Sequence, residues 1–200
     1  RFGSYGGGAY TDKNSPFFKW FDFRSYPDDY RCWWNFRDLP AINTANPDWR
    51  KYMITGEHSV VKTWLHDGAS GWRLDVADEL PDAFIALLKE RIRQIRPDAL
   101  LMGEVWEDAS NKTAYGRRRR YFTNAELDSV MNYPFAAAIL HFVRYGGGQA
   151  FLDAILSITE HYPPQVTAVL MNHIGTHDTC RILNMLATGG EYHSDPRERY

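Results

Sequence analysis

Cysteine is scarce in this sequence of 200 residues. Only Cys32 and Cys180 are present, and their separation gives neither a metal-binding spacing nor a disulfide framework. Reduced thiols are the default interpretation, and they favour a reducing compartment. We therefore expect a cytoplasmic location and no metal site.

Long apolar runs and a large excess of one charge are also absent. No run reaches the ~20 residues that a membrane-spanning helix needs. The first residues, RFGSYGGGAY, lack the basic start and apolar centre of a signal peptide. The formal net charge of −2 gives no reason to expect a nucleic acid or a membrane as a partner. The basic run RRRR at 117–120 is interpreted as a solvated loop paired with nearby acids rather than as a phosphate or nucleic-acid patch.

Glycine-rich phosphate-binding fingerprints follow none of the expected strands, which removes the main support for a doubly wound nucleotide-binding fold. Apolar strand-like runs instead alternate with segments of helical periodicity, as is typical of parallel βαβ units. We expect strands within residues 71–77, 99–106, 127–134 and 165–174. Helices are expected over residues 47–65, 81–96, 135–145 and 148–160, and again after 178. The fold class is therefore α/β, and a (β/α) barrel is the architecture that remains.

The first 46 residues differ from the rest, because they show no sustained helical or strand period. They are rich in Gly, Pro, Asp and aromatic residues, and we expect a separate irregular domain over 1–46. Asn46 and Pro47 then mark a helix start, as N-cap and first helical residue. Aromatic residues make up 15% of the whole chain. They could serve as core or as surfaces on which sugars or bases stack, and the sequence leaves both open.

Acidic residues stand at or just after the ends of three expected strands, namely Asp75, Glu104 and Asp178. Each alone could be a helix cap or a turn residue. In a (β/α) barrel, however, the chemistry lies at the C-terminal ends of the strands. Arg73 points to the same side of its strand as Asp75, because strand side chains alternate, and it should keep that carboxylate ionised. The apolar neighbours of Glu104 favour its protonated form, so the two acids suit a glycosidase nucleophile and general acid.

Four stretches carry a resemblance to a known family. GWRLDVADEL (71–80), MGEVWEDAS (102–110) and HIGTHDTCR (173–181) resemble three short conserved stretches of the α-amylase family of glycoside hydrolases. LPAINTANP (39–47) resembles a fourth, and together with DVADE it points to the neopullulanase and cyclomaltodextrinase-like branch. The resemblance covers nearly the whole chain. It implies a partial (β/α)8 TIM barrel, with about strands four to seven in residues 47–200, and a domain inserted after the third strand in residues 1–46.

The same resemblance assigns roles to the site residues. Asp75 would be the nucleophile, Glu104 the general acid/base and Asp178 the residue that stabilises the transition state. Arg73 would orient Asp75, and His177 would contact the sugar next to the cleaved bond. Three further residues are expected to bind substrate, although core packing or capping is an alternative for each: Glu79, Trp106 and Tyr133.

The implied activity is that of a retaining α-glycosidase acting on α-1,4 and also α-1,6 glucans or on cyclodextrins, by hydrolysis or by transfer. The alternative is a non-catalytic carbohydrate-binding protein, or an inactive fragment, with the same fold. The chemistry needs no cofactor. A structural calcium is compatible with the family, but its usual ligands are not all in this chain, and the Asp-x-x-x-Asn-His motif is expected upstream of Arg1. A homodimer of the full-length protein is also compatible with this branch.

Overall fold

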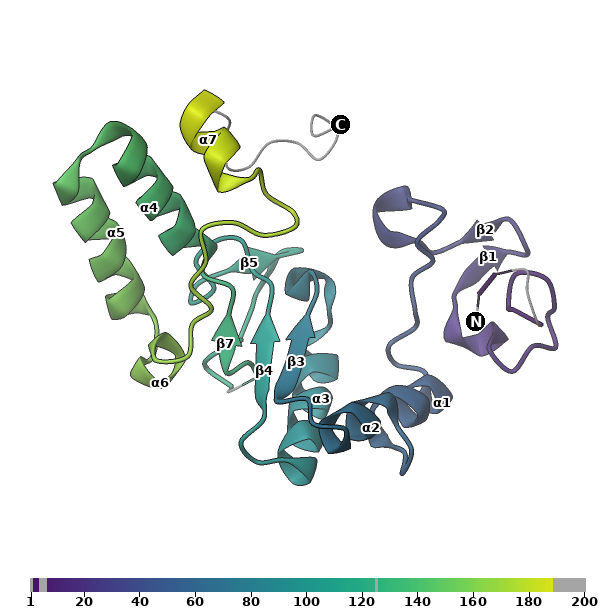
Figure 1. Ribbon diagram of the computed structural model, residues 1–200. Coiled ribbons are helices and arrows are strands. Elements are labelled where there is room, and N and C mark those ends of the chain that lie inside the picture. The colour runs from purple at the N-terminus through teal and green to yellow at the C-terminus, as the bar shows by residue number, and fades with distance from the viewer. Residues whose placement is uncertain (1, 4–6, 125, 189–200) are drawn as a thin grey trace. The chain divides into compact units, whose positions relative to one another are not determined.

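The computed structural model describes residues 2–3, 7–124 and 126–188 (Figure 1). The chain divides into two compact units, Arg1–Ala69 and Ser70–Tyr200, which are described separately. The sequence predicts a boundary between an inserted domain, residues 1–46, and the barrel, residues 47–200. The two compact units do not test that boundary, so it stays a prediction. None of the helices formed by the described residues is both long and apolar enough to cross a membrane.

The first unit begins with the irregular, aromatic-rich segment that the sequence predicts. Its regular structure is limited to two short strands, β1 (Phe23–Ser25) and β2 (Asp29–Tyr30), and two single 3₁₀ turns, η1 (Phe18–Trp20) and η2 (Trp33–Asn35). Aromatic rings pack this segment, with Phe2 edge-on to Phe21 at 4.8 Å between ring centroids and Phe18 stacked on Phe23 at 5.0 Å. Many of its aromatic side chains therefore contribute to packing.

The helix expected over 47–65 is broken in the middle. It forms as α1 (Pro47–Arg50), a π-helical turn η3 (Lys51–Thr55) and α2 (Val60–His66). The Asn46 side chain caps α1 by accepting the Trp49 N–H at 2.9 Å, as predicted. Gly56 ends the first part in an extended conformation, and a Cβ there would lie 2.5 Å from the Lys51 carbonyl oxygen. The single-helix prediction is therefore wrong, and Gly56 is the point where it fails.

The second unit is built on a parallel sheet of three strands in the order β3–β4–β7 (Figure 1). The strands are β3 (Gly71–Leu74), β4 (Leu100–Gly103) and β7 (Ser129–Val130). Leu74 pairs with Gly103, and Gly103 with Val130, so the three carboxyl ends stand at one edge. Helix α3 (Asp82–Ile95) connects the first two strands and buries the apolar face that the sequence predicts. The expected βαβ arrangement is confirmed for these strands.

The fourth expected strand, within 165–174, does not form. Residues Pro164–Thr167 are instead helix α6, which Pro164 favours at a first helical turn. Among the described residues that follow, up to 188, the strand is reduced to a single bridge between Met131 and Met171. Its parallel direction is the expected one, but β7 is two residues long and offers little backbone to pair with. The predicted strand is therefore wrong in its length but right in its place, since Met171 lies beside the end of β7.

A hairpin fills the loop after β4. Strands β5 (Thr113–Ala114) and β6 (Arg117–Arg118) are antiparallel. Tyr115 and Gly116 form the turn with left-handed φ values of 53° and 72°. The interpretation of RRRR as solvated is correct for Arg117, Arg118 and Arg120, which are exposed, but wrong for Arg119, which is 9% exposed. The expected pairing with acids is found for Arg119 and Arg120, which both lie beside Asp82.

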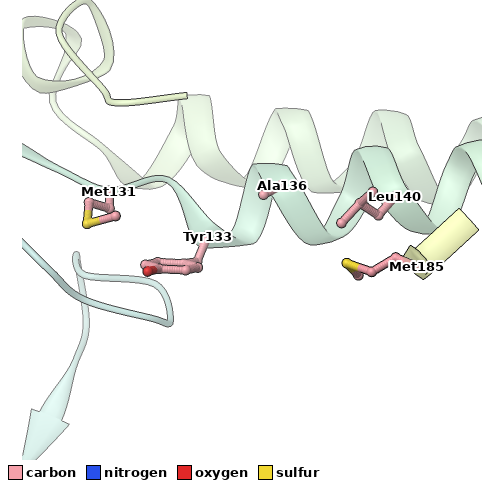
Figure 2. Packing of buried hydrophobic residues seen from close by; sticks show 5 residues of the cluster. All are labelled: Met131, Tyr133, Ala136, Leu140 and Met185. Atoms are coloured by element: carbon pink, nitrogen blue, oxygen red, sulfur yellow. The ribbon is translucent and has the colours of Figure 1, made fainter. Parts of the chain in front are cut away.

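Two helices follow the sheet, as the sequence predicts. They are α4 (Tyr133–Tyr145) and α5 (Gly148–His161), and α7 (Ile182–Thr188) comes after the loop that holds Asp178. Buried residues from the end of β7, from α4 and from α7 form one core cluster, shown in Figure 2: Met131, Tyr133, Ala136, Leu140 and Met185. This cluster packs against Trp106 and Cys180 and so fixes the loops around the expected site.

Candidate active site

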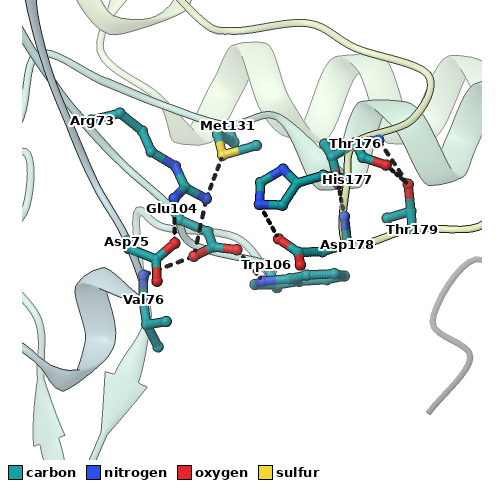
Figure 3. A network of polar contacts seen from close by, with 10 residues as sticks. All are labelled: Arg73, Asp75, Val76, Glu104, Trp106, Met131, Thr176, His177, Asp178 and Thr179. Atoms are coloured by element: carbon teal, nitrogen blue, oxygen red, sulfur yellow. Dashed lines mark hydrogen bonds and ion pairs between the residues drawn. The ribbon is translucent and has the colours of Figure 1, made fainter. Parts of the chain in front are cut away.

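One arginine joins the two acids that follow β3 and β4. Arg73 Nη1 forms an ion pair with Asp75 Oδ1, and Arg73 Nη2 lies 3.2 Å from Glu104 Oε2 (Figure 3). The parallel register explains why both acids reach Arg73. Leu74 pairs with Gly103, and Asp75 and Glu104 are the residues that follow this pair on the two strands. The opposite charges expected on one face of β3 thus pair with each other, and Arg73 also pairs with Glu104, which follows the neighbouring strand.

The two carboxyl groups differ sharply in exposure. The Asp75 side chain is 70% exposed, whereas the Glu104 side chain is 4% exposed. Glu104 is nonetheless in polar surroundings: Oε2 accepts the Val76 N–H at 2.7 Å, and Oε1 accepts the Trp106 indole N–H at 3.0 Å. The apolar setting expected for Glu104 is therefore wrong, because three donors reach its two oxygens. The arrangement combines one accessible carboxylate with one held rigidly beside it.

The third acid lies in the loop between Met171 and α7. Asp178 Oδ2 is 2.9 Å from His177 Nε2, and the His177 side chain is 72% exposed. The loop is shaped by two hydroxyl groups: Thr179 Oγ1 accepts the Thr176 N–H at 2.7 Å, and Thr176 Oγ1 accepts the Asp178 N–H at 3.2 Å (Figure 3). Such local bonds fix a turn and set the direction of the side chains it carries.

Tyr133 connects the acids of the sheet to this loop. Its ring stacks on Trp106 at 4.1 Å between centroids and meets the His173 ring edge-on at 4.7 Å. Burial raises the pKa of Tyr133, and the carboxylates of Glu104 and Asp178 raise it as well. Both carboxylates thus lie within electrostatic range of one hydroxyl. The Tyr133 side chain is 1% exposed, so it supports the Trp106 face more than it meets solvent.

Glu79 lies outside this network. Its carboxylate accepts a hydrogen bond from the hydroxyl of Tyr115, at the tip of the β5–β6 hairpin. It follows Asp75 by four residues, which span at most about 14 Å. The structure therefore groups Arg73, Asp75, Glu104 and Trp106 directly, and it places Glu79 at the side.

Sequence reasoning missed two features of the site. The first is the Val76 N–H that Glu104 accepts, which no side-chain pattern announces. The second is His173, which the strand prediction hid although a histidine in an apolar run was a visible signal. Within residues 2–3, 7–124 and 126–188, no group of three or more His, Cys, Asp or Glu side chains is arranged to hold a metal ion.

Comparisons with known proteins agree on one family. Residues 12–198 match the family described as alpha amylase, catalytic domain. The chain is 32% identical over 229 aligned positions to an amylopullulanase of Thermoanaerobacterium saccharolyticum, covering 99% of this chain and 17% of that protein. It is 35% identical over 147 positions to neopullulanase 2 of Thermoactinomyces vulgaris, covering 72% and 23%. The chain therefore spans less than a quarter of each of these two relatives.

Solved structures give the same result. A cyclomaltodextrinase superposes with a TM-score of 0.72 at 31% identity, covering 90% of this chain and 30% of that one. A cyclic alpha-maltosyl-(1→6)-maltose hydrolase from Arthrobacter globiformis, at 24% identity, supports the fold with a TM-score of 0.76 over 90% of this chain and 40% of that one. The chain belongs to the alpha-amylase catalytic domain family of glycoside hydrolases, and its fold is part of that family's TIM barrel.

Proposed function

We propose that this chain carries the catalytic residues of a retaining α-glycosidase. The observation that carries the proposal is the guanidinium of Arg73, which contacts both the exposed carboxylate of Asp75 and the buried carboxyl of Glu104. A retaining glycosidase needs two carboxyl groups in one pocket, one to attack the sugar and one to transfer a proton. Exposure divides the roles: Asp75 is open to a substrate, and Glu104 is held in place by three donors.

The proposed reaction has two steps. An Asp75 oxygen attacks the anomeric carbon while the bond from that carbon to the leaving oxygen breaks, and Glu104 gives its proton to the leaving oxygen. Glu104, now ionised, then removes a proton from water or from a sugar hydroxyl, which displaces Asp75. Water gives hydrolysis, and a sugar hydroxyl gives transfer. The three donors around Glu104 stabilise the charge that it carries between the steps.

The remaining site residues are proposed to bind the sugar. Asp178 and His177 offer an acceptor and a donor from a loop with a fixed turn. The indole of Trp106 offers a flat face for an apolar side of a sugar ring. The names of the relatives, an amylopullulanase, a neopullulanase and a cyclomaltodextrinase, support α-glucans, pullulan and cyclodextrins as substrates.

The test is the substitution Asp75→Asn in the full-length protein. It removes the nucleophile at nearly unchanged volume, and we expect turnover of maltotriose to fall by about 10⁴-fold. Asp98→Asn is the matched control, because Asp98 is an exposed acid that precedes β4, at the other end of that strand from Glu104. The measurement is the loss of maltotriose, with chromatography of the shorter and longer products.

Two results would overturn the proposal. The first is an Asp75→Asn protein that keeps the turnover of the control. The second is a wild-type protein that binds maltotriose but converts it into neither shorter nor longer products, which would establish the alternative of a carbohydrate-binding protein with the same fold.

A further inference from the structure

Val76, the residue after the proposed nucleophile, has a strained backbone. Its φ and ψ are 42° and 59°, in the left-handed region. A β-branched residue is rare in this conformation, and such strain persists only where the surroundings enforce it. The strain has a clear result: it directs the Val76 N–H at Glu104 Oε2, 2.7 Å away.

Part of the enforcement comes from the neighbouring strand. The Ala77 N–H donates to the Glu104 carbonyl at 3.1 Å, and the Glu104 N–H donates to the Leu74 carbonyl at 2.9 Å. These bonds fix the chain on both sides of Val76. The 3₁₀ turn that follows, η4 (Ala77–Glu79), uses the Val76 and Ala77 carbonyls for its own hydrogen bonds, so the carbonyls after them need donors from elsewhere.

Arg119 supplies those partners from the hairpin. Its Nη1 donates to the Asp78 carbonyl at 3.1 Å, and its Nη2 donates to the Leu80 carbonyl at 2.6 Å. Nη2 also lies 3.0 Å from Asp82 Oδ1, at the start of α3. One buried guanidinium therefore contacts the segment from Asp78 to Asp82, which begins in the turn after Val76, at three points.

Arg119 is itself fixed. Its guanidinium lies over the ring of Tyr121, 5.0 Å from the centroid. The Tyr121 hydroxyl donates to Asp78 Oδ1 at 2.7 Å, and Lys112 Nζ lies 3.1 Å from Asp78 Oδ2. Arginine, tyrosine and lysine from the same hairpin segment thus hold the backbone and the side chain of Asp78 together.

We propose that Arg119 is a positioning residue for Glu104. By holding the carbonyl groups of the turn after β3, it keeps Val76 in the conformation that presents its N–H to the Glu104 carboxyl. The inference rests on the proposed function for the role of Glu104 as proton donor. Its structural part, the link from Arg119 to the Val76 N–H, stands on the contacts alone.

The structural part is tested by hydrogen exchange in the full-length protein. With Arg119→Met, we expect the amides of residues 76–80 to exchange at least about tenfold faster, because the turn loses the donors that hold it. Arg118→Met is the matched control, since Arg118 is exposed on β6 and has no part in the contacts that hold the turn. Unchanged exchange in Arg119→Met would overturn the inference.

The catalytic part is tested with two substrates. Maltotriose needs its leaving oxygen protonated, whereas α-maltosyl fluoride releases fluoride without a proton. A residue that positions the general acid should therefore matter more for maltotriose. We expect Arg119→Met to lower kcat/KM, which covers the steps up to formation of the glycosyl-enzyme, about tenfold more for maltotriose than for the fluoride. Equal losses on both substrates would mean that Arg119 supports only the fold, and they would contradict the proposal.

Two further arms keep the test decisive. If Arg119→Met does not fold, the same ratio is measured with Arg119→Lys, whose compact ammonium lacks the planar fork that reaches the Asp78 and Leu80 carbonyls from two nitrogens. An unchanged ratio in that folded protein would count against the proposal. A wild-type protein inactive on both substrates would overturn the proposed function, while the exchange experiment would still decide the link between Arg119 and Val76.

Discussion

Arg73 is the residue that joins the two acids. It lies on β3, contacts the exposed Asp75 and reaches across the sheet to the buried Glu104. Strand alternation in the sequence places Arg73 and Asp75 on one face. Alternation cannot show that the same guanidinium reaches Glu104, since that contact depends on the register between β3 and β4. A buried carboxyl without such partners would be costly, so the arginine serves stability as well as the proposed chemistry.

His173 carries a prediction at the same scale. Burial lowers the pKa of His173 below its ordinary value of 6.5, so the folded protein favours the neutral ring. Below about pH 6.5 the His173 side chain of the unfolded chain binds a proton more readily than that of the folded protein. Protonation therefore favours the unfolded state, and the free energy of unfolding decreases as the pH falls. We expect His173→Phe, which keeps an aromatic ring against Tyr133, to lose less unfolding free energy than the wild type between pH 7.5 and 5.5. Urea denaturation at the two pH values measures it, and identical losses would contradict the assignment.

The end of β4 shows how an element positions the site. Gly103 allows the loop after β3 to pack closely, because a Cβ there would lie 3.2 Å from the Ala77 Cβ and 2.6 Å from the Leu127 Cδ1. Ala77 follows Val76, and the Val76 N–H donates to Glu104. A side chain at position 103 would push against Ala77 and so displace the Val76 N–H.

Gly103→Ala tests this connection. Overpacking costs about 1–3 kcal/mol, and we expect a loss of unfolding free energy in that range together with reduced turnover. Gly148→Ala is the control, since nothing lies within 4 Å of its Cβ position at the start of α5. Chemical denaturation gives the stability of both variants. A Gly103→Ala protein as stable and active as the control would show that the close packing has no such role.

At the scale of elements, the sequence predicts those helices and strands that depend on neighbouring residues alone. The helix α3 and the pair α4 and α5 follow from apolar periodicity and from glycine and proline at their ends. The apolar run 165–174 resembles a strand, but its pairing depends on β7, which is only two residues long. The burial of Arg119 was missed for a similar reason: its partners lie about 40 positions earlier in the chain, and RRRR by itself resembles a solvated run.

The whole molecule combines an irregular aromatic unit with a sheet unit that holds every directly connected site residue. The four stretches at 39–47, 71–80, 102–110 and 173–181 were enough to predict the family, which the match over residues 12–198 confirms. The left-handed conformation of Val76 had no signal in the sequence, since valine disfavours it. It follows from the packing of the loop against β4 and the hairpin.

The central claim is that Asp75 becomes covalently linked to the sugar. The most direct measurement uses the full-length Glu104→Gln protein with α-maltosyl fluoride. Fluoride leaves without a proton, but the second step lacks its base, so the glycosyl-enzyme should accumulate. We predict that mass spectrometry of the digested protein finds one maltosyl group on the peptide that contains Asp75. A sugar on another carboxylate, or fluoride release by the wild type that yields the inverted anomer, would contradict the account.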